Sequence, residues 1–373
     1  MQVTEVVTTP VAIKYRPEYQ ADKRYYPKPA EQTNVIIEIR TDDGTVGIGE
    51  AAHAPGIYGE TAGATIAGIE YLAPAIIGQD PRQITKINMA VDRLSPVGNI
   101  AAKAGLDIAL HDLTGKILGV PVYQLLGGRV HESLKTHITP ATYEGTADDL
   151  MDLVAQGYRA FKQKMSGDIG YDIPLVESLL DRVPDGIVLS LDVNQGWSVK
   201  DTLEVVTVLE RRAVHPRNVI LEQPIDGADI RGAARIRNAT NIPIMLDDGI
   251  RTAADLRRIL DAEAADIVSL KISRVGGIQR CLQMIKMAEA ANVSYIVDEI
   301  NEMRVANTAV AHLALASKAP LYTGVACHLL LENDIVTGGG VWIDKGEAYV
   351  NDRPGLGIDG LDLTAVAVPA ADA

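Results

Sequence analysis

Two lysines stand two residues apart in the stretch 160–165, which reads Ala-Phe-Lys-Gln-Lys-Met and whose apolar residues predict a β-strand. Residues two apart in a strand share a face, so the ammonium groups of Lys162 and Lys164 should point the same way. Each ammonium lowers the pKa of the other, which would make one of them a better base near neutral pH. Taken alone, the stretch also fits an edge strand with two solvated lysines.

Four further apolar runs each end in one ionisable residue. The runs are rich in leucine and β-branched residues and are continuous rather than alternating, as buried parallel strands are. They end at Asp192, Glu222, Asp247 and Lys271, and these positions follow Lys164 at successive intervals of 24 to 30 residues. One strand plus one helix fits each interval. The pattern predicts an α/β fold, a (β/α)₈ barrel whose active site lies at the C-terminal ends of its strands.

The barrel is expected over residues 126–330, with its first strand at 136–142, its seventh at 294–298 and its eighth at 322–326. Before it, residues 1–125 show two antiparallel strand pairings followed by helices, which predicts a small α+β domain. The two units together make an α/β barrel with an N-terminal α+β capping domain.

Two loops interrupt the N-terminal domain. Residues 15–31 contain several tyrosines, among them Tyr25 and Tyr26, together with basic residues, and this stretch is long for a hairpin connection. Long loops in compact domains are often lids over a site, and an ordinary surface loop is the alternative. A second loop at 51–60 contains glycine and proline. Residues 331–373 hold short strand and turn patterns rather than another domain.

The barrel geometry predicts where the ionisable residues lie. The second and sixth strands of an eight-stranded barrel face each other, so Lys164 and Lys271 should lie on opposite sides of a pocket, with Asp192, Glu222 and Asp247 on the arc between them. Three carboxylates in a partly buried site repel one another unless a cation lies among them. Oxygen ligands suit Mg²⁺, with Mn²⁺ as the alternative. The competing interpretation is that these acids only form salt bridges with the lysines.

Charge and composition restrict the partners. The chain has 373 residues and a formal net charge of −14, which argues against binding to nucleic acid or to a membrane surface. It contains no apolar run long enough to span a membrane, and its first residues lack a basic and hydrophobic signal segment. Two cysteines, Cys281 and Cys327, do not make a disulfide framework, so a reducing, cytoplasmic location is the simple interpretation.

These motifs resemble those of the enolase superfamily, in particular the muconate lactonising enzyme subgroup of the mandelate racemase/muconate lactonising enzyme family. The resemblance covers nearly the whole chain. It rests on Lys-x-Lys at 162–164, Leu-Asp-Val-Asn at 191–194, Leu-Glu-Gln-Pro at 221–224, Leu-Asp-Asp at 246–248, Lys-Ile-Ser-Arg-Val-Gly-Gly at 271–277, Pro-Gly-Leu-Gly at 354–357, and the spacing of Glu302 and His312. The resemblance implies that the loops 15–31 and 51–60 close over the substrate and that 331–373 returns to the cap. It also implies a homo-oligomer.

The resemblance further implies removal of the proton alpha to a carboxylate, through an enolate that a divalent metal ion on Asp192, Glu222 and Asp247 stabilises. Lys164 and Lys271 would act as bases on opposite faces of a small carboxylate substrate, which leads to racemisation or epimerisation. Residues expected to lie beside the substrate or the metal ligands are Lys162, Asn194, Asp248, Glu302, Tyr25 and Tyr26.

The same two lysines support other outcomes. Dehydration of a hydroxy amino acid such as a hydroxyproline, and cycloisomerisation of a muconate, each need one lysine as base or acid. The tyrosines and basic residues of loop 15–31 favour an amino-acid-derived substrate, and the segment 326–330 lacks the Asp-x-Asp that would indicate a dipeptide epimerase. A barrel that binds a metabolite without catalysis would be expected to have lost a ligand or a lysine, and here all are present.

Two features depart from the family pattern. Asp248 stands where the family commonly has Glu, so its expected pairing with the lysine of the sixth strand has a shorter reach. Residues 211–217 are a small insertion, expected on the outer or lower side of the barrel. The seventh strand ends in Asp298 and Glu299, without the histidine of the mandelate racemase subgroup, and His312 is expected to be a packed helix residue.

Overall fold

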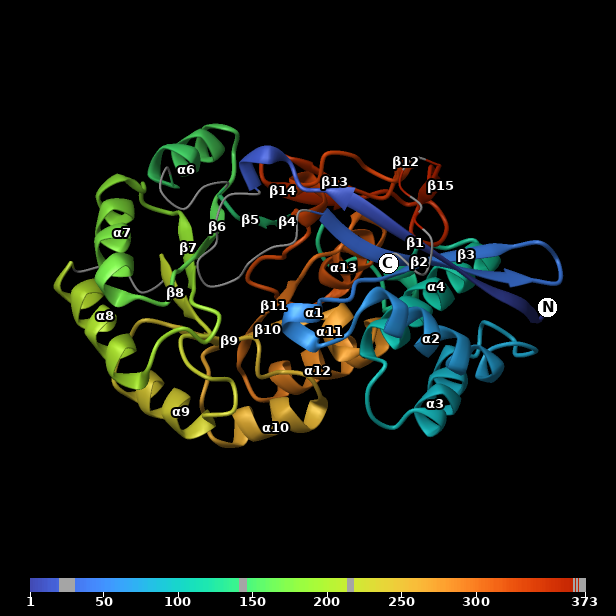
Figure 1. The fold of residues 1–373 in the computed structure, drawn as a ribbon, viewed down its shortest axis with the longest axis horizontal. Helices are drawn as coiled ribbons and strands as arrows, with labels where there is room; N and C mark the ends of the chain where they lie inside the picture. Colours follow the sequence, from blue (N-terminus) through green and yellow to red (C-terminus); the bar gives the residue numbers. More distant parts are fainter. Residues whose placement is uncertain (20–30, 141–145, 213–217, 365, 367, 369–373) are drawn as a thin grey trace.

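The computed structural model describes residues 1–19, 31–140, 146–212, 218–364, 366 and 368 (Figure 1). Its N-terminal part begins with an antiparallel sheet in the order β1-β2-β3, made of β1 (Val3–Lys14), β2 (Glu31–Thr41) and β3 (Val46–Ala51). Asp43 holds the turn between β2 and β3, because its carboxylate accepts hydrogen bonds from the Thr41 hydroxyl and the Thr45 amide. The short helix η1 (Pro17–Tyr19) follows β1.

Helices cover one face of this sheet: α2 (Ala62–Leu72), α3 (Ile84–Leu94) and α4 (Ile100–Leu118). α4 contacts both the sheet and the barrel helices α11 to α13, and its residues from Ala101 to Gly115 are all buried. A helix enclosed on every side has no polar face toward solvent, and its buried polar residues, such as Lys103, Asp107 and Asp112, have hydrogen-bond partners inside the protein instead. The shorter helices here are α1 (Pro55–Tyr58), which occupies part of the expected loop 51–60, η2 (Ala73–Ala75) and α5 (Val122–Leu125).

Seven parallel strands then form one curled sheet in sequence order. They are β5 (His137–Ile138), β6 (Ala160–Lys164), β7 (Val188–Asp192), β8 (Val219–Glu222), β9 (Ile244–Leu246), β10 (Ile267–Lys271) and β11 (Ser294–Asp298). The expected strand ends agree with these bounds to within one or two residues, apart from the first strand, whose expected end at 141–142 lies outside the described residues.

The eighth strand differs from the expectation. Residues 322–326 do not form a regular strand, and Thr323 instead makes isolated parallel bridges to Thr136 on one side and to Val297 on the other. The Thr323 amide donates to Lys135 and the next amide donates to Val297. A glycine and a following 3₁₀ helix, η3 (Cys327–Leu330), end the segment after these contacts. The barrel is therefore closed by one extended residue, Thr323, which bridges to both sides, rather than by a full ladder.

Amphipathic helices surround the sheet: α6 (Thr146–Ala155), α7 (Ile169–Arg182), α8 (Val199–Arg211), α9 (Ile230–Asn238), α10 (Ala253–Asp261), α12 (Ile278–Ala290) and α13 (Arg304–Ala316), with the short α11 (Ile272–Val275) directly after β10 (Figure 1). Reciprocal capping boxes begin α8 at Ser198 and α10 at Thr252. None of the described helices is long and apolar enough to cross a membrane.

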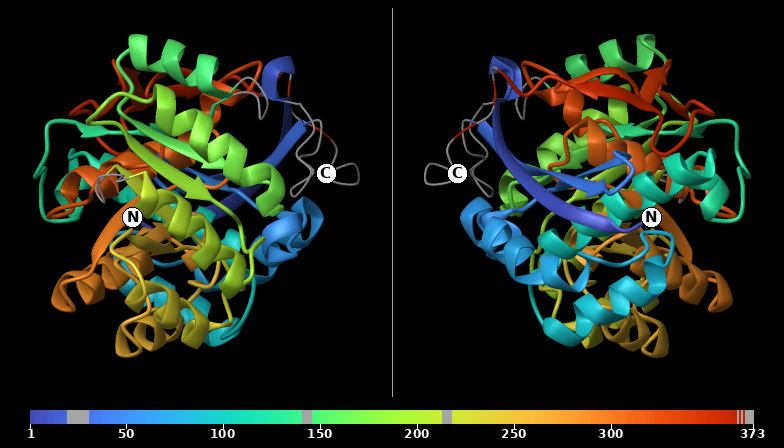
Figure 2. Two further views of the ribbon diagram at one scale, coloured as in Figure 1. Left: turned by 90° about the vertical axis from the view of Figure 1, so that its left-hand side faces the viewer. Right: turned by 90° about the vertical axis from the view of Figure 1, so that its right-hand side faces the viewer.

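The C-terminal segment contains four short strands, β12 (Val336–Gly339), β13 (Val341–Asp344), β14 (Glu347–Val350) and β15 (Ile358–Leu361). β12 pairs with β15. β13 pairs with β14, and β14 pairs on its other side with β4 (Leu134–Lys135), which precedes the barrel. The amide of Leu356 donates to Asp112 of α4, and that of Ala12 in β1 donates to the Val366 carbonyl. Figure 2 shows these red strands beside the blue N-terminal strands. The segment thus contacts the N-terminal part of the chain at two places.

Candidate active site

The interior of the barrel is built in layers. Its floor is an apolar cluster that takes one residue from most strands: Ala160, Ile220, Met245, Ile267, Ile296 and Tyr322. Because side chains alternate across a strand, the residue two positions further on each strand also points inward. Those residues are Lys162, Glu222, Asp247, Ser269, Asp298 and Gly324, and they form what we call the ionic layer. Above it, on the same faces, lie Lys164, Asp192 and Lys271.

Lys164 contacts the neighbouring strand. Its ammonium lies 2.5 Å from a carboxylate oxygen of Asp192 and 2.9 Å from the side-chain oxygen of Asn194. Asp192 is fully buried, whereas the Lys164 side chain is 31% exposed. Lys164 is therefore both ion-paired and open to solvent, as a proton-transfer group needs to be.

Non-glycine residues with positive φ lie just after the ends of β7 and β8: Asn194 at 46° and Gln195 at 71° follow β7, and Gln223 at 38° follows β8. Such backbone strain is sparse in proteins and gathers at functional sites. Hydrogen bonds hold Asn194 and Gln223, because the Asn194 side chain donates to Asp248, at 3.3 Å, and the Gln223 side chain accepts from the amide of Asp247, at 2.8 Å. The strained turns thus fix the carboxylates that precede and follow them.

Lys162 lies in the centre of the ionic layer. Its ammonium donates to Glu222 at 2.6 Å and to Asp298 at 2.9 Å, and all three side chains are buried. The second oxygen of Glu222 accepts a hydrogen bond from the Ser190 hydroxyl at 2.7 Å. The expectation that Lys162 and Lys164 point to the same face is confirmed, but Lys162 contacts carboxylates below the level of Lys164.

Lys271 and Arg274 share a carboxylate on the opposite side. Lys271 donates to one oxygen of Asp247 at 2.8 Å, and its ammonium lies 3.5 Å from Asp298. Arg274 donates to the other oxygen of Asp247 at 2.5 Å and lies 3.6 Å from Asp248. Among the described residues, Lys271 forms ion pairs with Asp247 and Asp298 rather than with Asp248, in line with the shorter reach expected for an aspartate at 248.

Lys164 and Lys271 are held on opposite strands. In the sheet order, β7, β8 and β9 separate β6 from β10, and in the other direction β5, the Thr323 segment and β11 separate them. Three positions therefore lie between the two lysines on either path around the barrel. The carboxylates of Asp192, Glu222 and Asp247 lie at the ends of the three strands on one of these arcs.

The electrostatics follow from burial and close pairing. Burial alone lowers the pKa of the Lys162 and Lys271 ammonium groups, but Asp298 with Glu222, and Asp247 with Asp298, outweigh it and raise both pKa values above the ordinary lysine value. The prediction that the neighbouring lysine lowers the pKa of Lys162 is therefore wrong, because the net shift is upward. Burial and the nearby Asp192 charge raise the pKa of Glu222 to about 7.

Asp247 and Asp298 show the opposite effect. Burial raises a carboxyl pKa, but Arg274 and Lys271 hold the pKa of Asp247 well below its usual range, and Lys162 and Lys271 do the same for Asp298. Both remain charged anions inside the barrel.

Three carboxylates lie close enough to hold a metal ion. One oxygen each of Glu222, Asp247 and Asp298 lie within 4.8 Å of one another, and all three residues are buried. An all-oxygen donor set of this kind fits a hard divalent cation. Asp192, which the sequence places in the metal cluster, lies one layer higher beside Lys164 and is not in this group. Sequence reasoning did not assign Asp298 a role.

The remaining predicted residues lie around this centre. Asn194 contacts both Lys164 and Asp248, as a residue supporting the site would. Glu302 is buried, and its carboxylate accepts from the amide of Ile300. Tyr25 and Tyr26 lie outside the described residues, and so does most of the insertion at 211–217. His312 is a packed residue, as expected, buried in α13 and stacked on Tyr123.

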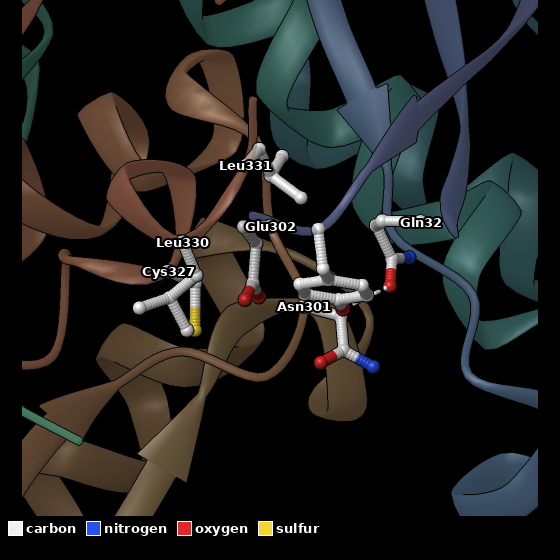
Figure 3. A pocket seen from close by; sticks show the side chains of 7 residues that line it. Gln32, Asn301, Glu302, Cys327, Leu330 and Leu331 are labelled. Atoms are coloured by element: carbon white, nitrogen blue, oxygen red, sulfur yellow. Dashed lines mark hydrogen bonds between the residues drawn. The ribbon is translucent and has the colours of Figure 1, made fainter. Parts of the chain in front are cut away.

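Glu302 lines a small pocket where the cap meets the barrel (Figure 3). Its wall consists of Tyr15 and Gln32 from the N-terminal strands and Asn301, Glu302, Cys327, Leu330 and Leu331 from the barrel. The Tyr15 hydroxyl donates to Gln32 at 2.8 Å, and Gln32 donates to Asn34. This pocket lies on the Lys271 side of the barrel, since Glu302 follows β11, the neighbour of the strand β10 that ends at Lys271.

Several residues that carry the site were missed in the sequence. His137 and Ser269 hydrogen-bond to Asp298, and Arg274 pairs with Asp247. His137 lies at the start of β5, one βα unit before the lysine strand β6, and is not part of a recognisable motif. Only its place in a predicted barrel strand could have indicated a role in the site. Arg274 lies in the Lys-Ile-Ser-Arg motif, but its partner Asp247 lies 27 residues upstream, after the preceding strand β9, and their contact is set by the tertiary fold.

Comparison with known proteins agrees with this arrangement. Residues 4–127 match the family model of the mandelate racemase/muconate lactonizing enzyme N-terminal domain, and residues 145–362 match the enolase C-terminal domain-like model. The N-succinyl-L-Arg/Lys racemase of Bacillus cereus is 34% identical over 333 residues, 88% of each chain, and its crystal structure superposes with a TM-score of 0.91 over 99% of both chains.

Two further relatives show the range of chemistry. A crystal structure of the dipeptide epimerase of Enterococcus faecalis, complexed with Mg and the dipeptide L-Leu-L-Tyr, has a TM-score of 0.89 and 30% identity, covering 96% of this chain and 99% of that one. Muconate cycloisomerase 1 of Pseudomonas putida is 32% identical over 336 residues, 88% of each chain. Matches to both domain models, together with relatives above 30% identity along most of their length, mean that this chain belongs to the mandelate racemase/muconate lactonizing enzyme family of the enolase superfamily.

Proposed function

We propose that this protein is a divalent-metal-dependent racemase or epimerase that moves the proton alpha to the carboxylate of a small amino-acid-derived acid. The observation that carries the proposal is the placement of Lys164 and Lys271 on opposite strands of the barrel, with three strand positions between them on either path and acidic residues on the arcs. A substrate carbon in the mouth between two such lysines has one on each face.

The roles follow from this arrangement. Lys164 removes the alpha proton from one face, and Lys271 delivers a proton to the other, so the configuration inverts; the reverse direction exchanges the roles. Asn194 keeps the Lys164 ammonium in place by accepting its hydrogen bond, at 2.9 Å. Lys162, which is buried below, balances the carboxylates rather than reaching the substrate.

For the metal we propose Mg²⁺, held by Asp192, Glu222 and Asp247. A divalent cation there would stabilise the negative charge that develops on the substrate carboxylate. Asp192 is chosen over Asp298 because Asp298 already accepts hydrogen bonds from His137, Lys162 and Ser269, whereas Asp192 accepts from Lys164 and one backbone amide. Fewer donors have to be displaced from Asp192.

The substrate class rests on the relatives. Proteins named N-succinyl-L-Arg/Lys racemase and dipeptide epimerase are among the most similar chains, and both act on acylated or peptide-linked amino acids. A muconate cycloisomerase at 32% identity makes cycloisomerisation the second candidate. Dehydration of a hydroxy amino acid uses the same lysines and stays an untested alternative.

Proton NMR in D₂O with Mg²⁺ tests the proposal. The panel contains both enantiomers of N-succinyl-arginine and N-succinyl-lysine, dipeptides such as L-Ala-L-Glu and L-Leu-L-Tyr, hydroxyprolines and cis,cis-muconate. Loss of the alpha-proton signal with the skeleton intact, together with appearance of the other stereoisomer, is the expected result. A lactone from muconate, or a keto or imine product from a hydroxyproline, would replace the proposal by the corresponding alternative.

The double variant Lys164→Ala/Lys271→Ala and an EDTA-treated sample serve as controls. Both should leave the alpha-proton signal unchanged. Exchange that persists in the double variant would mean that other groups move the proton and would contradict the two-lysine assignment.

A further inference from the structure

Asp298 is the most heavily engaged carboxylate of the barrel interior. It ends β11 and is fully buried. One oxygen accepts from the His137 ring at 2.7 Å, and the other accepts from Lys162 and from the Ser269 hydroxyl, both at 2.9 Å. The Lys271 ammonium lies 3.5 Å from that second oxygen. Asp298 therefore contacts two of the three lysines of the site.

The absence of a side chain at Gly324 leaves space for the Asp298 carboxylate. Gly324 lies on the closing segment, and a Cβ there would be 2.1 Å from an Asp298 oxygen and 2.4 Å from the His137 ring nitrogen. Gly324 does not have a positive φ, so its backbone conformation would accept alanine and only the side-chain space forbids it. The inward side chain that the eighth strand would supply is replaced by the Asp298–His137 pair.

His137 holds Asp298 from the far side. It lies on β5, and its ring donates from Nε2 if Asp298 is the acceptor, which leaves Nδ1 as the acceptor nitrogen. Nδ1 is buried and has no hydrogen-bond partner among the described residues. Burial lowers the pKa of the imidazole, so the histidine acts as a neutral donor that orients the carboxylate without adding charge.

Of the four buried carboxylates at the strand ends, Asp298 is the one that is not proposed to bind the metal. Asp192, Glu222 and Asp247 each face a lysine, and these are the acids proposed to take up the metal. A carboxylate that turns to a metal ion weakens its contact with a lysine. Asp298, which keeps its own donors, is then the anion left to hold the buried ammonium groups.

We propose that Asp298, oriented by His137 and Ser269 in the space left by Gly324, is the positioning residue that holds Lys271 and Lys162 in place while Asp247 and Glu222 bind the metal. The inference rests on the proposed function in that it takes Lys271 as the base of one face. Asp298 touches neither substrate nor metal in this assignment, and it acts through the lysines.

The first test resolves the two faces of the reaction. Initial rates of deuterium uptake are measured from each pure enantiomer of N-succinyl-arginine, or of the panel compound that turns over best, with Mg²⁺. Lys271→Ala identifies the enantiomer that Lys271 serves. Asp298→Asn should slow that enantiomer about 10–100-fold, as loss of a supporting carboxylate typically does, and leave the enantiomer served by Lys164 within about threefold of the wild type.

A purely structural role would slow both enantiomers alike, and that outcome would overturn the proposal, as would a selective loss on the Lys164 face. Gly324→Ala is the second variant, because it displaces the Asp298–His137 pair without changing any charge. The same face-selective loss is expected. Gly63→Ala, at a helix position with nothing within 4 Å of the added Cβ, is the matched control and should change neither rate.

A third test needs no substrate and separates this inference from the proposed function. Binding of Mn²⁺ alone is titrated by electron paramagnetic resonance for the wild type, Asp298→Asn and Asp192→Asn. Asp298→Asn should lose less affinity than Asp192→Asn, and in Mn²⁺-loaded crystals Asp298 should still contact Lys162 and Lys271. An equal or larger loss in Asp298→Asn, or Asp298 bound to Mn²⁺, would make it a ligand and end the proposal even if the panel shows racemisation.

Discussion

At the scale of single residues, the site is a set of buried charges that balance one another in pairs. Lys162 with Glu222 and Lys271 with Asp247 lie inside the barrel, and each carboxylate is fully buried. Removing one partner of a buried pair is costly, about 3–5 kcal/mol, because it leaves an uncompensated charge. Variants of this site therefore need a measurement of folding beside every measurement of activity.

Lys164 and Lys271 should each be needed for proton exchange on one face of the substrate. Lys164→Ala and Lys271→Ala are each expected to lower deuterium uptake from one enantiomer about 10²–10⁴-fold, the usual range for a general base, while the opposite enantiomer still exchanges. Racemisation should stop in both variants, since it needs both faces. The NMR assay above measures this. Lys286→Ala, an exposed lysine on α12, is the control and should behave as wild type. Unchanged racemisation in either lysine variant would contradict the two-base route.

Glu222 should matter for the metal. Glu222→Gln removes one buried anion while keeping the side-chain shape, and it leaves Lys162 with Asp298 as its remaining partner. We expect Mn²⁺ affinity to fall by at least about 10–100-fold, with the lysine contacts otherwise retained. Titration of Mn²⁺ against the purified variant measures the loss. The exposed Glu132→Gln is the matched control. Equal affinity in Glu222→Gln and wild type would exclude this residue as a ligand.

At the scale of elements, glycines decide how closely β3 and α4 approach. A Cβ on Gly49 would lie 2.2 Å from the Gly105 carbonyl oxygen and 2.8 Å from the Ala109 amide, and these are backbone atoms that cannot rotate away. The contact fixes the cap sheet against the helix that in turn packs on the barrel.

Gly49→Ala should therefore lower the free energy of unfolding by about 1–3 kcal/mol or more, as overpacking does. Urea denaturation followed by circular dichroism measures the change. In contrast, Gly63→Ala in α2 has open space and should stabilise by about 0.5–1 kcal/mol, the usual gain for alanine in a helix. An unchanged free energy of unfolding in Gly49→Ala would contradict this prediction, because it would mean that β3 and α4 can move apart without a loss of stability.

The positions of some helices and strands are set by the local sequence, and those of others by pairing with segments far away in the chain. β1 and α10 form where the sequence carries local signals, a β-branched run in β1 and a capped amphipathic segment in α10. The segment 322–326 does not form the expected strand, since its pairing depends on β5 and β11, which lie far away in the chain. Local propensity cannot report whether a barrel closes through a full strand or through one residue.

At the scale of the whole molecule, a buried acid joins the cap to the barrel. Glu50 of β3 accepts hydrogen bonds from the amides of Met303 and Ala306 at the start of α13 and from the Asn34 side chain. The carboxylate thus caps a barrel helix, where the amide dipoles favour negative charge. Burial nevertheless raises the pKa of Glu50 from 4.5 to about 7.

This shift predicts a pH dependence with a definite sign. Because the folded pKa of Glu50 lies above the unfolded value, folding favours its protonated form, and this contribution to stability is present below about pH 4.5 and is lost as the pH rises to about 7. The loss is of the order of 1–3 kcal/mol. Urea denaturation at pH 5, 6, 7 and 8 measures it. Glu50→Gln should show a shallower fall over this range, and identical slopes would contradict the assignment.

Assembly stays a prediction from the family resemblance. A homo-oligomer is expected, and static light scattering of the purified protein would give its mass. A monomer at all concentrations would contradict the expectation and would leave the cap and barrel of one chain to close the site alone.

The amino-acid sequence by itself determined the repeating βα units, the residue that ends each strand and the family, because continuous apolar runs and the interval between ionisable residues are properties of the chain taken in order. It predicts that Lys164, Lys271, Asp192, Glu222 and Asp247 lie together at the C-terminal ends of the strands. The tertiary structure alone decided which charges meet. Asp298 and His137 stand 161 residues apart in the chain and come within 2.7 Å only because β5 and β11 flank the closing segment at Gly324. No local pattern encodes that contact, since it depends on the curvature that closes the sheet.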